Sequence, residues 1–403
     1  MLTLQDLQEA CAAGGASVLT SVTELEPAAG KHASVAPAKF VDSRSNNSVF
    51  AFETRFVNGR PSKAVIIDSK QSSINRGENA VSTAIQDGDA NMSRIPRIVV
   101  SYENGPTLSD FDLPHRFSDG HIRAGSIDGK PATSNDQYRK VRDSTMRDAS
   151  AILNIAPSAL LYGGWDSTRK WNQLRLRSAL VGEVVGILAD QTVPGEEQQS
   201  IRGGARVDPV AASVKLDPAI LDKLVDAQED ELSPSNVSKN RNEIKAAKKG
   251  DTVSASTIGL GAIPPTLNAL GGVSCQRIIR SWVLSFSTLR QLRFGGSVEQ
   301  DIAARCLIAA LGLVTIARAE QELYLRANCD LVEAAAPVVK LDRRQGNFDE
   351  LSPITVPEAD ALFADALAHA ESTGIIKWNG QTLNVVGNPD ILGAAVEAEE
   401  NED

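Results

Sequence analysis

The stretch Pro157–Gly186, PSALLYGGWDSTRKWNQLRLRSALVGEVVG, holds the strongest structural signals in this sequence. Its apolar run Ala159–Tyr162 predicts a buried strand that turns at Gly163-Gly164, and the apolar residues from Val181 to Ile187 predict a helix. Polar, aromatic and cationic residues lie between them: Trp165, Asp166, Ser167, Thr168, Arg169, Lys170, Arg175 and Arg177. An aromatic ring beside clustered cations is typical of a surface that holds a nucleic-acid backbone. A tryptophan after a strand can equally plug the edge of a sheet, so both interpretations stay open.

Two strand-then-helix units predict an α+β fold with a split βαβ core. The alternation of strands and helices is too irregular for a Rossmann fold or a barrel. The units are a strand over 63–69 with a helix over 71–85, and a strand over 271–285 with a helix over 298–319.

Other segments carry weaker signals. Helices are predicted over 2–13, from Asp217-Pro218 onward and over 357–372. A strand is predicted over 95–102, and a hairpin is predicted around Asn379-Gly380. Residues 24–48 read as a polar connector and 233–256 as a flexible or extended excursion.

The charge of the chain is unevenly distributed. The 403 residues carry a net charge of −10, and residues 342–403 hold 13 acidic and 3 basic side chains. The remaining residues are therefore balanced, and they include basic runs at 239–249 and 275–296. Such runs attract polyanions locally whatever the overall charge, although they can also be solvated faces.

Composition also predicts the compartment. Four widely spaced cysteines without a C-x-x-C pair indicate reduced thiols. The N-terminus lacks the basic start of a secretion signal, and the apolar run Cys306–Ala317 is short for a membrane span. We therefore expect a cytoplasmic protein with no membrane partner.

Catalytic signatures are sparse. The sequence has no phosphate-loop motif and no G-x-S-x-G nucleophile elbow. Carboxylates and imidazoles at Asp112, His115, Asp119 and His121 have spacings that could hold Mg²⁺ or Mn²⁺ for phosphodiester cleavage. Arg116 and Arg123 lie among them and would repel a cation but attract phosphate, so contact with RNA is the favoured reading; a polar loop remains the alternative.

Further phosphate contacts are predicted nearby and in the second unit. Residues 138–147 combine four cations with two hydroxyls, a set that binds phosphate or simply forms the surface of an amphipathic helix. Arg277 and Arg280 would lie on opposite faces of a strand, so only one of them could face a ligand.

Several ordered motifs resemble one family. They are S-x-x-N-R-x-E at Ser72, Asn75, Arg76 and Glu78; LPHRFSD at 113–119; SALLYGGWDS at 158–167; RSALVGEVVG at 177–186; Gly271-Gly272-Val273; and Leu284-Ser285 with LRQLRF at 289–294. Together they resemble the RAMP-type backbone subunit, of the Cas-seven lineage, of type I-U (I-G) CRISPR interference complexes. The resemblance covers most of residues 60–325.

This resemblance implies a modified RNA-recognition-motif (ferredoxin-like) core with large insertions, including a thumb that we place at about 235–263. The organisation expected is an N-terminal helix and connector over 1–60, the core over 61–340, a C-terminal helix and hairpin over 341–390 and an acidic tail over 391–403. A non-catalytic subunit of this kind polymerises along CRISPR guide RNA in a Cascade complex and presents the guide to target DNA. Its further partners are copies of itself, other Cascade subunits and a helicase-nuclease.

No metal or cofactor is expected. The predicted RNA-binding residues are Asn75, Arg76, Arg116, Ser118, Arg123, Arg142, Ser144, Arg147, Trp165, Asp166, Ser167, Arg175, Arg177, Lys248, Arg277 and Arg280. Two alternatives stay open: a metal-dependent ribonuclease, which could also use a lone thumb aspartate such as Asp251, and a structural adaptor.

Overall fold

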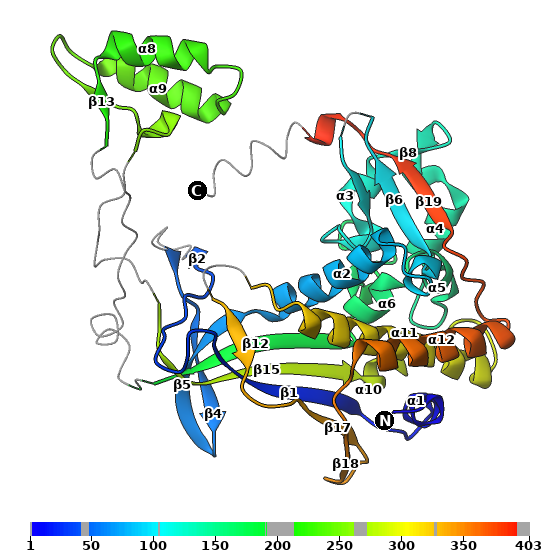
Figure 1. Cartoon of the computed structure of the whole chain (residues 1–403). Helices are drawn as coiled ribbons and strands as arrows, with labels where there is room; N and C mark the ends of the chain where they lie inside the picture. Colours follow the sequence, from blue (N-terminus) through cyan, green and yellow to red (C-terminus); the bar gives the residue numbers. More distant parts are fainter. Residues whose placement is uncertain are drawn as a thin grey trace. The chain divides into compact units, whose positions relative to one another are not determined.

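A computed structural model describes residues 2–41, 48–103, 105–189, 191, 213–261, 272–325 and 329–392. It divides the chain into two compact units (Figure 1). The first comprises residues 1–191 and 274–389, and the second comprises residues 192–273 with 390–403.

The first unit is built on a large antiparallel sheet. Its strand order is β18 (Phe348–Leu351), β17 (Val338–Asp342), β1 (Val18–Pro27), β15 (Cys275–Ser285), β12 (Leu180–Leu188), β5 (Arg60–Asp68) and β4 (Phe52–Val57), and β16 (Leu331–Glu333) also pairs with β1. Along the chain, β1, helix α2 (Lys70–Gln86), β12, β15, helix α11 (Val298–Gln321) and β17 follow one another in βαββαβ order. With the four strands side by side as β17-β1-β15-β12, this is the ferredoxin-like arrangement, which confirms the predicted α+β fold.

Helices cover one face of this sheet (Figure 1). Helix α11 contacts α2, α1 (Leu4–Cys11) and α12 (Val356–Ser372), and a short helix α10 (Phe286–Leu289) links β15 to it. Helix α11 is long and apolar enough to cross a membrane, but 89% of its most apolar window is buried inside the fold. It is therefore built as the central core helix of this unit.

Two glycines make room for neighbouring side chains in the core, one in β12 and one in α2. A Cβ atom at Gly182 of β12 would lie 2.4 Å from the ring of Trp282 on the neighbouring strand, and one at Gly77 of α2 would lie 2.5 Å from Thr315 of α11. Trp282 is buried, so the glycine opposite it makes room for the largest side chain of the core.

A second lobe of the first unit is inserted between α2 and β12. Its sheet has the order β7 (Thr107–Ser109), β6 (Arg97–Ser101), β19 (Thr382–Val386), β8 (Ser126–Ile127) and β9 (Lys130–Pro131). Short helices complete it: α3 (Gly120–Arg123), α4 (Asp136–Asp143), α5 (Ser150–Ile155) and α6 (Ser158–Tyr162). The remaining short elements of the unit are the β2–β3 pair (Phe40–Val41 and Ser48–Val49), the β10–β11 pair (Gly164–Trp165 and Arg175–Leu176) and single 3-10 turns at 92–94, 116–118 and 132–134.

The second unit has its own small core. It comprises β13 (Lys215–Leu216), α8 (Pro218–Ala227), α9 (Pro234–Ala246), β14 (Val253–Ser254) and a 3-10 turn at 256–258. Leu221, Val225, Val253 and Ala255 are buried together at its centre. Part of the segment predicted as a thumb, 235–261, lies here, whereas residues 262–263 lie outside the described residues.

Two predictions for the stretch that opened the sequence analysis are wrong in type. Residues 158–162 form helix α6 rather than a strand, and the run around Val181–Ile187 is strand β12 rather than a helix. Pro157 precedes α6 and Gly163, with φ +89°, ends it; these are ordinary start and stop signals of a helix. Strand β12 is buried on both faces, so its β-branched residues follow one another without alternation.

Three further predictions are corrected. Residues 233–256 include helix α9, capped by Ser233 with Pro234 in its first turn, which packs Val237 and Ile244 on the small core. The connector predicted over 24–48 overlaps strand β1, which ends at Pro27. The Asn379-Gly380 turn does not make a hairpin, because β19 pairs in parallel with β6 instead. From residue 393 on, the predicted acidic tail lies outside the described residues.

Candidate nucleic-acid interface

Residues Gly164–Ser178, which we call the tryptophan hairpin, project from the inserted lobe. Strands β10 and β11 pair Trp165 with Arg175, and the guanidinium of Arg175 lies 5.1 Å from the centre of the Trp165 ring. Gly163 precedes the hairpin with φ +89°, and a Cβ atom there would meet the backbone nitrogen of Ser178 at 2.9 Å. Only glycine fits this close approach without strain, so it fixes where the hairpin begins.

The hairpin exposes two tryptophans rather than one. Trp165 is 50% exposed and Trp171 is 75% exposed, and the ammonium of Lys170 lies 5.8 Å from the centre of the Trp171 ring. Large aromatic rings that stay in solvent beside cations are suited to stacking on unpaired bases. The sequence contained the signal for Trp171, a tryptophan following Arg169-Lys170, but only Trp165 was predicted as a stacking residue.

Three cations of the hairpin are free to bind a ligand. Lys170, Arg175 and Arg177 are exposed and form no ion pair within the described part of the chain. Arg169 differs, because it pairs with Asp143 at 2.7 Å. The free cations therefore create an uncompensated positive field on this surface.

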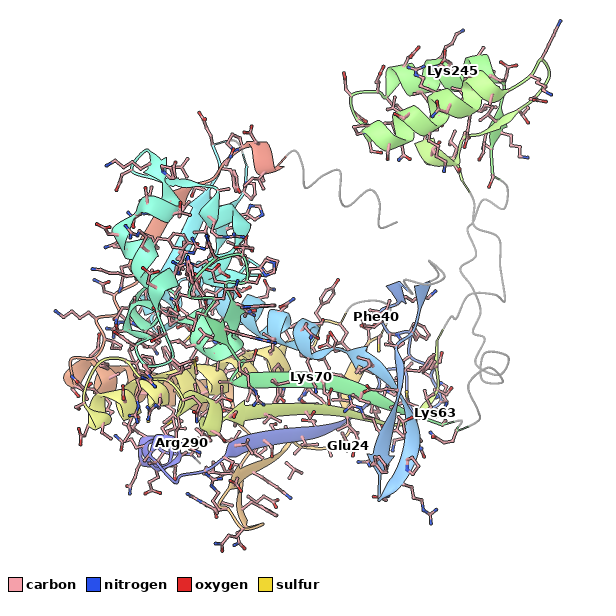
Figure 2. All side chains as sticks on the ribbon, turned by 180° about the vertical axis from the view of Figure 1, so that it is seen from behind. Glu24, Phe40, Lys63, Lys70, Lys245 and Arg290 are labelled. Carbon is pink, nitrogen blue, oxygen red and sulfur yellow. The ribbon has the colours of Figure 1, made fainter. Side chains whose placement is uncertain are left out.

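A cavity of about 550 Å³ adjoins the hairpin. Its lining, which we call the cationic pocket, consists of Lys70, Gln71, Ile74, Arg175, Leu176, Arg177, Ser178 and Val181. Lys70, labelled in Figure 2, is the first residue of α2, and it lines the pocket together with Gln71 and Ile74 of the same helix. Asn75, one turn further along α2, is exposed as well. Three cations and a helix N-terminus around one cavity favour phosphate over any cationic ligand.

Buried contacts hold the hairpin in place. Arg142 forms a two-pronged ion pair with Asp166, at 2.8 and 3.1 Å, and the Asp166 side chain is fully buried. The Ser118 hydroxyl donates to the Trp165 carbonyl at 3.2 Å, Arg116 donates to the Gly163 carbonyl at 3.2 Å, and Arg123 donates to the Thr168 hydroxyl. Five residues predicted to touch RNA thus position the hairpin: Arg116, Ser118, Arg123, Arg142 and Asp166.

Two buried carboxyl groups, those of Glu78 and Asp110, have raised pKa values. Glu78 is buried and accepts two hydrogen bonds from Arg116, yet burial raises the pKa of its carboxyl to about 7. Burial likewise raises the pKa of the Asp110 carboxyl to about 6, although the Ser158 hydroxyl and the Ile98 amide donate to it. Burial therefore brings the titration of both carboxyls closer to neutral pH.

The remaining predicted residues divide by exposure. Arg280 is buried, with Glu320 at 3.1 Å and Glu333 at 2.5 Å, and Arg76 pairs with Asp68 at 2.7 Å. Arg277 is bound to Glu24, and the Ser144 hydroxyl donates to the Lys140 carbonyl. Asn75, Arg147, Ser167 and Lys248 are exposed. The burial of Arg280 and Asp166 leaves no atom of their charged groups for a ligand, which corrects their assignment as contact residues.

The residues of the predicted metal site make other contacts. Asp112 accepts from the hydroxyls of Ser109 and Ser82, and Asp119 accepts from the backbone of His115 and caps α3. His121 lies 2.5 Å from the Tyr102 hydroxyl. Across the described ranges, no group of three or more His, Cys, Asp or Glu side chains is arranged to hold a metal ion.

Comparison with known proteins finds one similar family, which covers part of the chain. Residues 19–191 match the family of CRISPR-associated protein GSU0053. The matched segment runs from β1 to the end of β12, so it includes the tryptophan hairpin and every residue of the cationic pocket. No curated protein matches the chain significantly. The match covers less than half of the 403 residues and shows that this segment is similar to a CRISPR-associated family.

Proposed function

We propose that the protein is a guide-RNA-binding backbone subunit of the Cas-seven lineage, in its type I-U (I-G) form. It binds RNA without reading sequence, associates with further copies of itself and other Cas subunits, and leaves recognition of target DNA to base pairing by the guide. It acts in the cytoplasm and does not itself cut nucleic acid, which is left to a helicase-nuclease partner.

One observation carries the proposal. Lys70, Arg175 and Arg177 line one pocket, and the hairpin that supplies Arg175 and Arg177 also exposes two tryptophans and Lys170, all within a segment that matches a CRISPR-associated family. Stacking platforms beside a cationic groove bind single strands in a sequence-tolerant way. The ferredoxin-like core agrees with this reading, because RNA-recognition motifs are built on the same βαββαβ order.

The test is binding of single-stranded RNA of roughly 30 nucleotides to the full chain, followed by fluorescence anisotropy over a series of salt concentrations. We expect the double variant Arg175→Ala/Arg177→Ala to bind at least about tenfold more weakly and to lower the slope of log affinity against log salt by about 1.4, since two phosphate contacts are lost. Arg60→Ala/Lys377→Ala, which removes the same charge from exposed positions elsewhere, is the matched control. Equal losses in both double variants would mean that the pocket is not the binding site.

A further inference from the structure

Strand β4 is an edge strand with an open outer side. It lies at the end of the large sheet and pairs only with β5 among the described strands. The Ile66 amide donates to the Ala51 carbonyl at 2.9 Å, which fixes the phase of the ladder. Since bonded and non-bonded pairs alternate in an antiparallel ladder, residues 53, 55 and 57 bond to β5. The backbone groups of Phe52, Thr54 and Phe56 therefore point outward.

The sequence of β4 is complementary to its own reverse. It reads Phe52-Glu53-Thr54-Arg55-Phe56, with Thr54 at the centre. If a second β4 runs antiparallel to it about Thr54, Phe52 lies opposite Phe56 of the other copy, and Thr54 lies opposite Thr54. Glu53 then lies opposite Arg55, so the pairs on either side of the central Thr54–Thr54 pair are aromatic with aromatic, or acid with base.

The same register satisfies the open backbone. The outward groups are those of residues 52, 54 and 56, and the pairs 52–56, 54–54 and 56–52 are the ones that would exchange hydrogen bonds. Phe52 and Phe56 lie on the same face of the strand and are 40% and 75% exposed. Aromatic and opposite-charge pairs are the cross-strand contacts that stabilise a sheet most.

Arg55, on the other face of β4, is already held in position by contacts within its own chain. Arg55 is held by Glu183 of β12 through two hydrogen bonds of 3.0 Å, and it also contacts Glu53. Its position is therefore fixed before a partner arrives, which lowers the entropy lost on association.

Strand β4 lacks most of the features that protect edge strands, and its two half-buried charges, Glu53 and Arg55, neutralise each other. Protected edge strands are short or carry lysine, proline or inward charges. Strand β18 at the opposite edge fits that description, with four residues that include Asp349 and Glu350, whereas β4 has six residues without lysine or proline.

We propose that two copies of this chain associate through β4 in a two-fold symmetric dimer, which joins their large sheets across Thr54. A two-fold contact of this kind is closed and uses the same patch on both copies. It does not depend on RNA, so it describes the free protein before any assembly on a guide. One strand buries less surface than a standard interface, so we expect dissociation on the order of 10–100 µM.

The test is sedimentation velocity of the full chain without RNA, over a concentration series that spans that range. Thr54→Pro removes an outward amide without removing a bond to β5, so we expect at least a tenfold weaker dimer with unchanged thermal unfolding. Thr54→Val keeps the amide and is the matched control, which should dimerise as the natural chain does. A chain that stays monomeric throughout, or a dimer that Thr54→Pro leaves intact, overturns the proposal.

Charge variants decide the matter if Thr54→Pro fails to fold. Glu53→Arg alone and Arg55→Glu alone place like charges opposite each other, so each should be monomeric. An equimolar mixture of the two restores opposite charges in both pairs, so a heterodimer should form. Monomers in the mixture, or dimers of each variant alone, would contradict the register centred on Thr54.

Discussion

At the scale of single residues, the ion pair that an arginine forms decides whether its guanidinium is available to a ligand. Arg142, Arg175 and Arg177 occur within one region of sequence, yet Arg142 is locked onto the buried Asp166 while the other two are exposed and unpaired within the described residues. The sequence predicted an aromatic ring beside cations around Trp165 but could not separate these roles, because pairing depends on contacts between residues 24 positions apart.

Breaking the Arg142–Asp166 pair should release the hairpin. Arg142→Met leaves the buried Asp166 carboxylate with Arg169 alone, at 4.0 Å, which costs up to about 3–5 kcal/mol in the free energy of unfolding. We expect RNA affinity to fall as well, because Trp165 and Arg175 lose their fixed position although Arg142 itself touches no RNA.

Urea denaturation, tryptophan emission and RNA titration measure the three effects. Arg147→Ala removes an exposed arginine nearby and should leave stability and tryptophan emission unchanged. An Arg142→Met protein with native emission and weakened RNA binding would instead make Arg142 a direct contact.

The buried carboxyl of Glu78 should make stability depend on pH. Its pKa is raised from 4.5 to about 7 in the folded protein, so the folded state binds more protons than the unfolded state between these values. The contribution of Glu78 to stability is therefore fully present below pH 4.5 and is lost as pH rises to about 7, by on the order of 3 kcal/mol.

Glu78→Gln removes the titration, so the difference in unfolding free energy between the natural chain and this variant should shrink over the same window. Urea denaturation at half-unit pH steps measures it. A difference that grows with pH would show that the ion pair with Arg116 outweighs burial.

At the scale of elements, the sequence predicted positions better than types. The strand β5, the helix α2, the strand β15 and the helix α11 lie where their periodicity placed them. The short apolar run of α6 was mistaken for a strand, and β12 for a helix, because a fully buried segment has no polar face to reveal its period. Parallel pairing of β19 with β6 joins segments that are distant in sequence, and no local signal encodes it.

The packing of β12 on β15 supplies an element-scale prediction. Gly182→Ala adds a methyl group 2.4 Å from the ring of the buried Trp282, so the indole must shift. We expect a loss of about 1–3 kcal/mol in unfolding free energy, as overpacked cores show. Thermal and urea denaturation measure it, with Ser281→Ala on the other face of β15 as the control. Equal stability of both variants would mean that the Trp282 ring can shift to accept the added methyl group without a cost in free energy.

At the scale of the whole molecule, the second unit interrupts a hairpin. Strands β12 and β15 are neighbours in the sheet and pair up to Leu188 and Cys275, although residues 192–273 lie between them along the chain. The second unit has its own buried core, so neither unit needs the other to bury its apolar side chains. The basic run at 239–249 marked this region in the sequence, but no sequence signal indicated a separate buried core.

Excision tests that independence. Replacing residues 190–273 with a short Gly/Ser turn should leave a protein that unfolds cooperatively, because β12 and β15 remain antiparallel neighbours. RNA binding through the tryptophan hairpin should persist, whereas any contribution from Lys248 is lost. Circular dichroism and RNA titration measure both outcomes; a shortened chain without a cooperative transition would show that the second unit supports the sheet.

The position of β19 has a consequence for biosynthesis. This strand, close to the C-terminal end of the given sequence, lies between β6 and β8 in the sheet of the lobe that presents the tryptophan hairpin. A ribosome releases β6 and β8 long before it releases β19, so the lobe cannot close its sheet during most of translation. If the lobe binds RNA as proposed above, chains truncated before Thr382 should therefore bind it more weakly than chains that include β19.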